Sequence, residues 1–240
     1  MTLNTEFMRE TFLAAGAGVP TTLTLTAVAL LISFPIGFFM ALGKEGGGRI
    51  TKKVIAFYVS FVRGTPIVLQ ILFVYSLLPS LLNHIVKNML GLSYNVFDIN
   101  PIIYAFLVFS FNTVAVLSEA FRSALLTVNH GQMEAALAAG LNRIQAYMRI
   151  IIPQALVAAL PNICNTTVNL LKSTSLAYMM TVKDITAIAK LNAAKGYNYI
   201  EAYIVIFFIY ILICTAVQLL FHVIENTGRK RGRSSRVFQR

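Results

Sequence analysis

The chain has 240 residues, of which 57% are hydrophobic and only 12% are charged, whereas soluble domains are about half apolar and a quarter charged. This balance excludes an ordinary soluble domain and indicates an integral membrane protein. The net charge of +11 does not favour nucleic-acid binding, because the basic residues cluster between and after the apolar runs, where membrane orientation explains them. The 2 cysteines and 3 scattered histidines indicate neither a disulfide framework nor a metal site.

Five apolar stretches are long enough to cross a bilayer, whose hydrocarbon core takes roughly 20 helical residues. The stretch over 54–82 is too long for one straight helix and is interrupted by Arg63-Gly64-Thr65-Pro66, which predicts a short interfacial helix followed by a span from Pro66. A six-span alternative, in which 54–82 crosses twice, would need spans too short for the bilayer. The sequence therefore predicts an all-α integral membrane protein in which 1–240 form one domain with spans at 19–42, 66–82, 101–128, 155–171 and 199–223.

The basic residues also predict the orientation, because cytoplasmic loops carry excess Lys and Arg. With the C-terminus inside, the inside segments hold 12 of these residues and the outside segments 6. This predicts an external N-terminus and a cytoplasmic C-terminus with a basic tail at 229–240, which we expect to be unstructured and close to lipid. Four of the 6 outside charges lie in 172–195, so we expect that segment to be partly buried against a pore. The glycines in 43–48 predict a flexible cytoplasmic turn.

A helix-turn-helix pattern lies between the third and fourth spans. Glu134-Ala135-Ala136 is followed by Gly140 and then by Ile150-Ile151-Ile152-Pro153. The pattern resembles the E-A-A loop of permease subunits in ATP-binding-cassette (ABC) importers of the MetI-like fold, with Ile152 where that family usually has Leu. An ordinary amphipathic cytoplasmic loop is the alternative, and the spacing through Gly140 to Pro153 disfavours it.

Further motifs narrow the resemblance to the polar amino acid branch of these permeases, over about 18–224. They are Thr21-Thr22-Leu23-Thr24-Leu25, Phe61-Val62-Arg63-Gly64-Thr65-Pro66, Ser118-Glu119-Ala120-Phe121-Arg122, Gly131-Gln132-Met133-Glu134-Ala135-Ala136 and Leu171-Lys172-Ser173-Thr174-Ser175-Leu176.

The resemblance implies a permease subunit in a bacterial plasma (inner) membrane, serving a polar amino acid of the cystine, glutamine, arginine or histidine class. It implies pairing with a second permease subunit, identical or closely related, with two ATPase subunits inside and a substrate-binding protein outside. Because the chain has no G-x-x-x-x-G-K-[ST] motif, we expect it to bind no cofactor itself and expect ATP and Mg²⁺ on the partner ATPase.

The residues expected to couple to the ATPase lie in the loop 131–153, and they are Glu134, Ala135, Ala136, Gly140, Arg143 and Pro153. Glu134 is expected in the first turn of an Ala-rich helix, where a carboxylate complements the positive helix end, and Gly140 can supply the left-handed residue that ends the helix. The slim alanine surface suits insertion into a groove of a partner. Pro153 is expected to break the next helix and to start the fourth span, so that force at the loop would rotate that span.

Polar residues at membrane depth are candidates for a substrate path. Those selected are Arg63, Thr65, Asn112, Glu119, Lys172, Ser173, Thr174 and Ser175. Arg63 would either hold a substrate carboxylate or fix the helix break. Glu119 and Arg122 share a helical face and are expected to form a structural or gating ion pair rather than to bind a substrate ammonium group. Residues 172–175 would either bind a carboxylate or end one helix and cap the next.

Two other function classes stay open. A channel or secondary carrier that is not driven by ATP would have no need of a cytoplasmic coupling helix. A membrane-embedded enzyme would need converging catalytic groups, and only Glu119 and Arg122 share a helical face. Because Glu119 is the one acidic candidate within a span, we favour a cystine-type or neutral polar cargo.

Overall fold

Helices make up the regular structure of this chain. The structure is a computed structural model that describes the backbone of residues 3–236 and the side chains of 3–226 except His130, and it contains no strand within those residues. In chain order the elements are α1 (Thr5–Gly16), α2 (Val19–Gly46), α3 (Arg49–Gly64), α4 (Ile67–His84), η1 (Ile85–Met89), η2 (Val96–Asp98), α5 (Pro101–Leu126), α6 (His130–Ala138), α7 (Arg143–Ala146), η3 (Tyr147–Ile151), α8 (Ile152–Ser173), η4 (Thr174–Met180), α9 (Ile185–Ala194) and α10 (Tyr199–Arg236).

Five helical stretches among the described residues are long and apolar enough to cross a membrane. They are Val19–Gly46, Ile67–Met89, Pro101–Leu126, Arg143–Met180 and Tyr199–Asn226. The fourth stretch extends well beyond the predicted span 155–171 at both ends, because α7, η3, α8 and η4 follow one another as a continuous helical run. The prediction of an all-α protein with about five membrane helices is confirmed.

The helices α2 and α5 pack closely through a stripe of mostly small residues on α2. Leu25, Ala29, Ser33, Gly37 and Ala41 recur every four residues and are all buried, so they lie on one face of the helix. A Cβ on Gly37 would lie 3.1 Å from both Leu117 Cβ and the backbone nitrogen of Ser118 on α5. Small residues allow such a close backbone approach between helices within a bilayer.

Specific contacts fix the register of that pair. The Ser33 hydroxyl donates a hydrogen bond to the carbonyl of Ser110 at 3.0 Å, in a buried position. Phe121 of α5 lies edge-to-face against Phe34 and Phe38 of α2, with ring centroids 4.9 and 5.5 Å away. Aromatic pairs of this kind contribute about 0.5–1.5 kcal/mol each beyond the area that they bury. We conclude that α2 and α5 form the rigid centre of the molecule.

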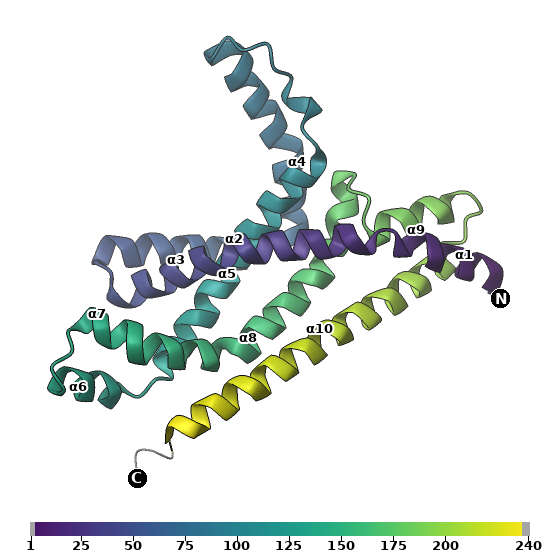
Figure 1. Cartoon of the computed structure of the whole chain (residues 1–240). Helices are drawn as coiled ribbons and strands as arrows, with labels where there is room; N and C mark the ends of the chain where they lie inside the picture. Colours follow the sequence, from purple (N-terminus) through teal and green to yellow (C-terminus); the bar gives the residue numbers. More distant parts are fainter. Residues whose placement is uncertain (1–2, 237–240) are drawn as a thin grey trace.

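The remaining elements are distributed around this centre (Figure 1). The hairpin of α6 and α7 lies at one end of the molecule, and α1 and α9 lie at the other, where α9 packs on α1 and α10. The helix α10 begins at the α1 end and ends on the side where α6 lies, whereas α4 projects away from the other helices. Opposite ends of the bundle therefore carry the hairpin and the α1–α9 pair.

Two of the predictions for the connecting segments need correction, and a third is confirmed in part. Residues 43–46 are not a flexible turn but the last turn of α2, because Lys44 and Glu45 form ion pairs with α5 and only Gly47 and Gly48 stay outside the helix. The segment 172–195 is partly buried as predicted, since Ile185, Ala189 and Ala193 of α9 are buried with α1 and α10 residues. Its place beside a pore stays a prediction. The basic tail was predicted to be unstructured, but the helix α10 continues through it as far as Arg236. Residues 237–240 lie outside the described residues.

A substitution at Gly18 tests the close contact between the start of α2 and the start of α9. A Cβ there would lie 2.5 Å from the nitrogen of Ile185 and 2.6 Å from the carbonyl carbon of Asp184. Backbone atoms cannot rotate away, so Gly18→Ala should lower the free energy of unfolding by about 1–3 kcal/mol. Thermal melting of the detergent-purified chain measures this loss. Gly16→Ala is the matched control, because a Cβ there meets nothing within 4 Å, and equal melting of both variants would contradict the contact.

Candidate coupling hairpin and polar sites at membrane depth

The hairpin between α5 and α8 is a rigid structure closed by local hydrogen bonds. Asn129 caps α6 by accepting a bond from the Gly131 nitrogen at 2.9 Å. At the other end Gly140 has a φ of +85°, and the nitrogens of Gly140 and Leu141 donate to the carbonyls of Leu137 and Ala136 at 3.0 and 3.1 Å. This is a Schellman termination, which requires the left-handed residue that glycine supplies. The prediction for Gly140 is confirmed.

The second arm of the hairpin begins with a capping box. Asn142 accepts from the Gln145 nitrogen at 2.9 Å, and the Gln145 side chain accepts from the Asn142 nitrogen at 3.0 Å. The chain then runs through the π-helical turn η3, where the Ile152 nitrogen bonds to the carbonyl of Tyr147. Pro153 lies at the start of α8 as expected, yet no break separates α8 from the arm before it. The proline follows directly on the π-helical turn, where the hydrogen bond runs five residues back, and such a turn accommodates it within a continuous helix. The hairpin is therefore joined directly to α8.

The exposed surface of the hairpin differs from the predicted one. Glu134 is exposed, but it lies in the second turn of α6 because Asn129 starts that helix earlier than expected. Ala136 lies on the buried face of α6, whereas Ala135, Ala138, Ala139 and Arg143 are exposed as expected. Sequence reasoning missed the exposed apolar residues Leu137, Ile144 and Met148, of which Ile144 is 76% exposed. Their signal was available, since apolar side chains flanked the motif in a segment expected to face water.

A network of four charged side chains joins α2 to α5 on the hairpin side. Glu119 pairs with Lys44 through one carboxylate oxygen, and the other oxygen accepts from Arg122 Nε at 2.9 Å. Arg122 Nη1 also lies 3.7 Å from Glu45 Oε1. Both oxygens of Glu119 are therefore engaged by cations, and its side chain is only 17% exposed. This arrangement favours the structural or gating ion pair over recognition of a substrate ammonium group, and it adds Lys44 and Glu45, which sequence reasoning missed.

Gln70 organises the break between α3 and α4. Its amide nitrogen donates to the Val62 carbonyl at 2.9 Å and to the Thr65 hydroxyl at 2.8 Å, and its oxygen accepts from Asn112 at 3.1 Å. Backbone groups freed by a helix break at membrane depth must find partners inside the protein. Thr65 and Asn112, predicted for a substrate path, therefore take part in this structural network. Arg63 is exposed beside it.

The hydroxyl groups of Ser173 and Thr174, at the junction of α8 and η4, bond to carbonyls of α8 and do not cap the next helix. Ser173 donates to the Asn169 carbonyl at 2.8 Å, and Thr174, which is fully buried, donates to the Leu171 carbonyl at 2.6 Å. Ser175 is partly buried and Lys172 is exposed. The cap of the following helix α9 is Asp184, ten residues further along. Of residues 172–175, only Lys172 therefore presents a polar group fully at the surface.

Asp184 is a buried carboxylate that sequence reasoning missed. Oδ1 accepts from the Ala187 nitrogen at 2.8 Å, and Oδ2 lies 3.5 Å from the Tyr210 hydroxyl of α10. The residue is fully buried, and this burial raises the pKa of Asp184 to about 6, although hydrogen bonds from the backbone of Ala187 and Thr186 act in the opposite direction. The available signal was an acid placed immediately before an apolar helical pattern.

The raised pKa of Asp184 makes stability depend on pH. The ordinary pKa is 3.8, so between about pH 6 and pH 4 the folded chain takes up a proton that the unfolded chain does not bind. Lowering the pH from about 7.5 to about 5 should therefore raise the free energy of unfolding by about 1 kcal/mol. Asp184→Asn keeps the helix cap and should lose this rise in thermal melting, whereas Asp98→Asn, at an exposed position, should keep it. An unchanged pH response in Asp184→Asn would contradict the assignment.

Five apolar helical stretches, one of them continuous with the second arm of an exposed hairpin, define a polytopic membrane protein. Residues 33–230 match the family described as binding-protein-dependent transport system inner membrane component. The chain belongs to this family. It is therefore a membrane-embedded transport component, and the predictions of the permease family and of a transport subunit instead of an enzyme are confirmed.

Several characterised or probable permeases are similar over nearly the whole chain. A probable amino-acid permease protein, YxeN, of Bacillus subtilis is 31% identical, covering 95% of this chain and 97% of its own length. The L-cystine transport system permease protein TcyL of the same organism is 32% identical, covering 89% and 87%. The nopaline transport system permease protein NocM of Agrobacterium fabrum is 32% identical, covering 93% and 91%.

Solved structures agree with this fold. A crystal structure of an amino acid ABC transporter with histidines has a TM-score of 0.79 and 27% identity, covering 95% of this chain and 100% of the other. An inward-facing structure of the MetNI methionine ABC transporter has a TM-score of 0.67 at 16% identity, covering 90% and 94%. The second likeness concerns the fold alone.

Proposed function

We propose that the chain is the permease subunit of an ATP-driven importer for a polar amino acid and that it engages a separate ATPase through the hairpin 131–153. Two ATPase subunits would carry ATP and Mg²⁺, a second permease subunit would complete the membrane pathway, and an extracytoplasmic binding protein would deliver the cargo. The observation that carries the proposal is an exposed hairpin, closed at both turns by hydrogen bonds, that continues without a break into α8.

The surface of the hairpin supports docking of a protein partner. Leu137, Ile144 and Met148 are exposed apolar residues beside the polar ends of Glu134 and Arg143. Apolar side chains that face water favour burial against another surface, at about 25 cal/mol per Å². A short helix with apolar anchors fits the helix-in-groove mode of recognition. Because α8 follows directly, a movement of the hairpin would be passed to a membrane helix as a rigid displacement.

The proposed orientation puts the hairpin in the cytoplasm and the N-terminus outside. The hairpin and the basic α2–α3 turn lie on one side of the molecule, and α1 and α9 lie on the other (Figure 1). The cytoplasmic side of a membrane protein carries more Lys and Arg, which supports placing the α2–α3 turn and the hairpin there. This arrangement leaves the α1–α9 end for the binding protein.

The cargo class rests on the relatives and on two exposed cations. The relatives named above carry names of amino-acid, L-cystine and nopaline permeases, which supports an amino acid or amino acid derivative. Arg63 and Lys172 are the two exposed cations among the residues proposed for the substrate path. Either side chain could bind the carboxylate of an amino acid. Glu119, Thr65, Asn112 and Thr174 already hold bonds within the chain, so we assign them to shaping the path.

Ile144→Asp tests the coupling hairpin. A carboxylate at this 76% exposed position would have to be desolvated at a partner surface, so ATPase recovered with the permease should fall by about tenfold or more. The measurement is copurification of the ATPase from native membrane, normalised to the permease. Leu191→Asp on α9, also exposed, is the control at the opposite end and should recover the ATPase normally. Normal recovery with Ile144→Asp would remove the hairpin from the interface.

Cargo and ATP dependence are tested together with the complex reconstituted in vesicles. Uptake of cystine, glutamine, arginine and histidine is measured with the binding protein present, and we expect one of them to stimulate ATP hydrolysis. Vanadate should abolish uptake. Uptake that persists with vanadate would favour the carrier or channel instead, and stimulation by none of the four would remove the polar amino acid assignment.

A further inference from the structure

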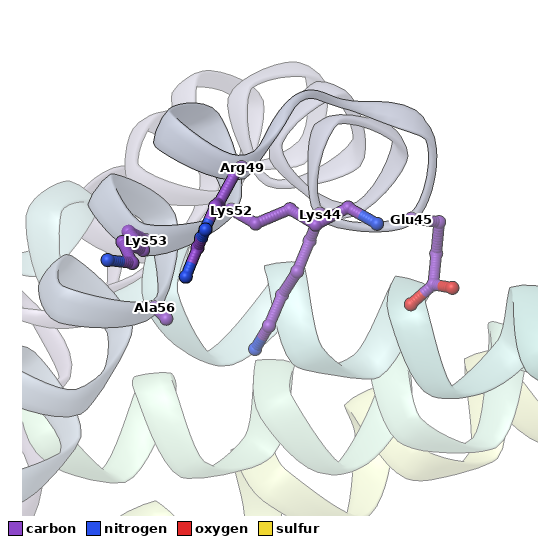
Figure 2. A pocket seen from close by; sticks show the side chains of 6 residues that line it. All are labelled: Lys44, Glu45, Arg49, Lys52, Lys53 and Ala56. Atoms are coloured by element: carbon purple, nitrogen blue, oxygen red, sulfur yellow. The ribbon is translucent and has the colours of Figure 1, made fainter.

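The turn between α2 and α3 forms a basic hollow of about 490 Å³. Figure 2 shows the side chains that line it, gathered around the turn: Lys44, Glu45, Arg49, Lys52, Lys53 and Ala56. Four of the six carry positive charge. The hollow lies on the same side of the molecule as the hairpin (Figure 1), but none of its residues belongs to the hairpin or was assigned to coupling.

The charges of this hollow are not balanced within the described part of the chain. Glu45 pairs with Arg122, and Lys44 pairs with Glu119. The other three cations, Arg49, Lys52 and Lys53, are exposed, and none forms an ion pair with a described residue. Three cations within five residues repel one another unless an anion or water screens them. The hollow therefore favours an anionic occupant.

The backbone contributes charge of the same sign. The 16-residue helix α3 begins at Arg49, and its cap, Gly48, has no side chain that could accept a bond from the first N–H groups. The unsatisfied N–H groups and the helix dipole make the start of a helix favourable for an anion, including a phosphate group. The cationic side chains and the helix start thus act on the same small volume.

An apolar stripe leads away from the hollow along α3. Ile50, Val54, Phe57 and Phe61 are between 55% and 80% exposed, and their spacing places them on one face. The opposite face packs against the bundle through Val59 and Val62, which are buried with Ala115 of α5. An occupant that matches both features has an anionic phosphate head and long apolar chains.

We infer that the α2–α3 turn and the exposed face of α3 bind an anionic phospholipid. Arg49, Lys52 and Lys53 contact its phosphate headgroup, and Ile50, Val54 and Phe57 lie along its acyl chains. A soluble phosphate would satisfy the cations but leave the stripe uncovered, so the lipid is the occupant that fits both. In the orientation proposed above, the lipid belongs to the cytoplasmic leaflet, which is rich in anionic lipids; binding itself does not depend on that orientation.

The test measures lipid retained by the full purified chain in detergent, counted by native mass spectrometry. The probes are phosphatidylglycerol, phosphatidylcholine with the same acyl chains, and inorganic phosphate. We expect phosphatidylglycerol to be retained in preference to phosphatidylcholine, and R49Q/K52Q/K53Q to weaken its apparent affinity by about tenfold or more. R49K/K52R/K53R, which keeps the charges, should retain it. The triple change R9Q/K183Q/K195Q removes three exposed charges at the α1–α9 end and should leave retention unchanged.

Three results would overturn the inference. Equal loss in the two charge-removing triple variants would mean that net charge, not this site, holds the lipid. Equal retention of phosphatidylglycerol and phosphatidylcholine would remove the role of the cations. Inorganic phosphate that displaces phosphatidylglycerol at equal concentration would make the hollow a site for soluble anions. Phe57→Ser, which leaves the charges intact, should weaken retention of phosphatidylglycerol but not binding of phosphate, and this keeps the inference testable if the triple variant is poorly folded.

Discussion

The close approach of α2 and α5 is the constraint on which the rest of the structure depends. In a bilayer the lipid chains are as apolar as the helix surfaces, so helices associate through shape and hydrogen bonding more than through exclusion of water. Gly37 and its small neighbours let the two backbones meet, and the buried bond from Ser33 to Ser110 fixes their register. The ion pairs of Lys44, Glu45, Glu119 and Arg122 then close the same interface near its end.

In the proposed transporter, the hairpin and α8 would move relative to the fixed pair of α2 and α5. The helix α8 packs on α5 and carries the hairpin at its start, and the base of the hairpin is buried with the ends of α2 and α5 through Ala41, Leu125 and Met133. A partner that displaced the hairpin would therefore act on the α5–α8 contact first. The helix α4, which projects from the bundle (Figure 1), has fewer contacts to lose, and its exposed apolar surface is available to lipid or to a second subunit.

Buried polar groups are where reasoning from the sequence was least successful. Gln70 lies in an apolar run and was not selected, yet it satisfies the carbonyls freed by the break before Pro66. Asp184 lies in the segment 172–195 and was not selected, yet it is fully buried beside Tyr210 of α10. In both cases the residue type was visible in the sequence, but the partner lies far away along the chain, and distance in sequence says nothing about which helices meet.

The sequence by itself determined the class of the protein. The length and hydropathy of the apolar stretches predicted five spans. Gly140 predicted the end of the first hairpin helix, and the motifs indicated the family. These features depend on local chemistry, because a bilayer demands runs of apolar residues and a helix end demands particular capping residues. Only the tertiary structure decided which polar residues contact one another. It shows that two cations hold Glu119 and that three cations at the start of α3 have no ion-pair partner among the described residues. Those facts depend on which helix faces meet in space, and many alternative pairings share the same apolar pattern.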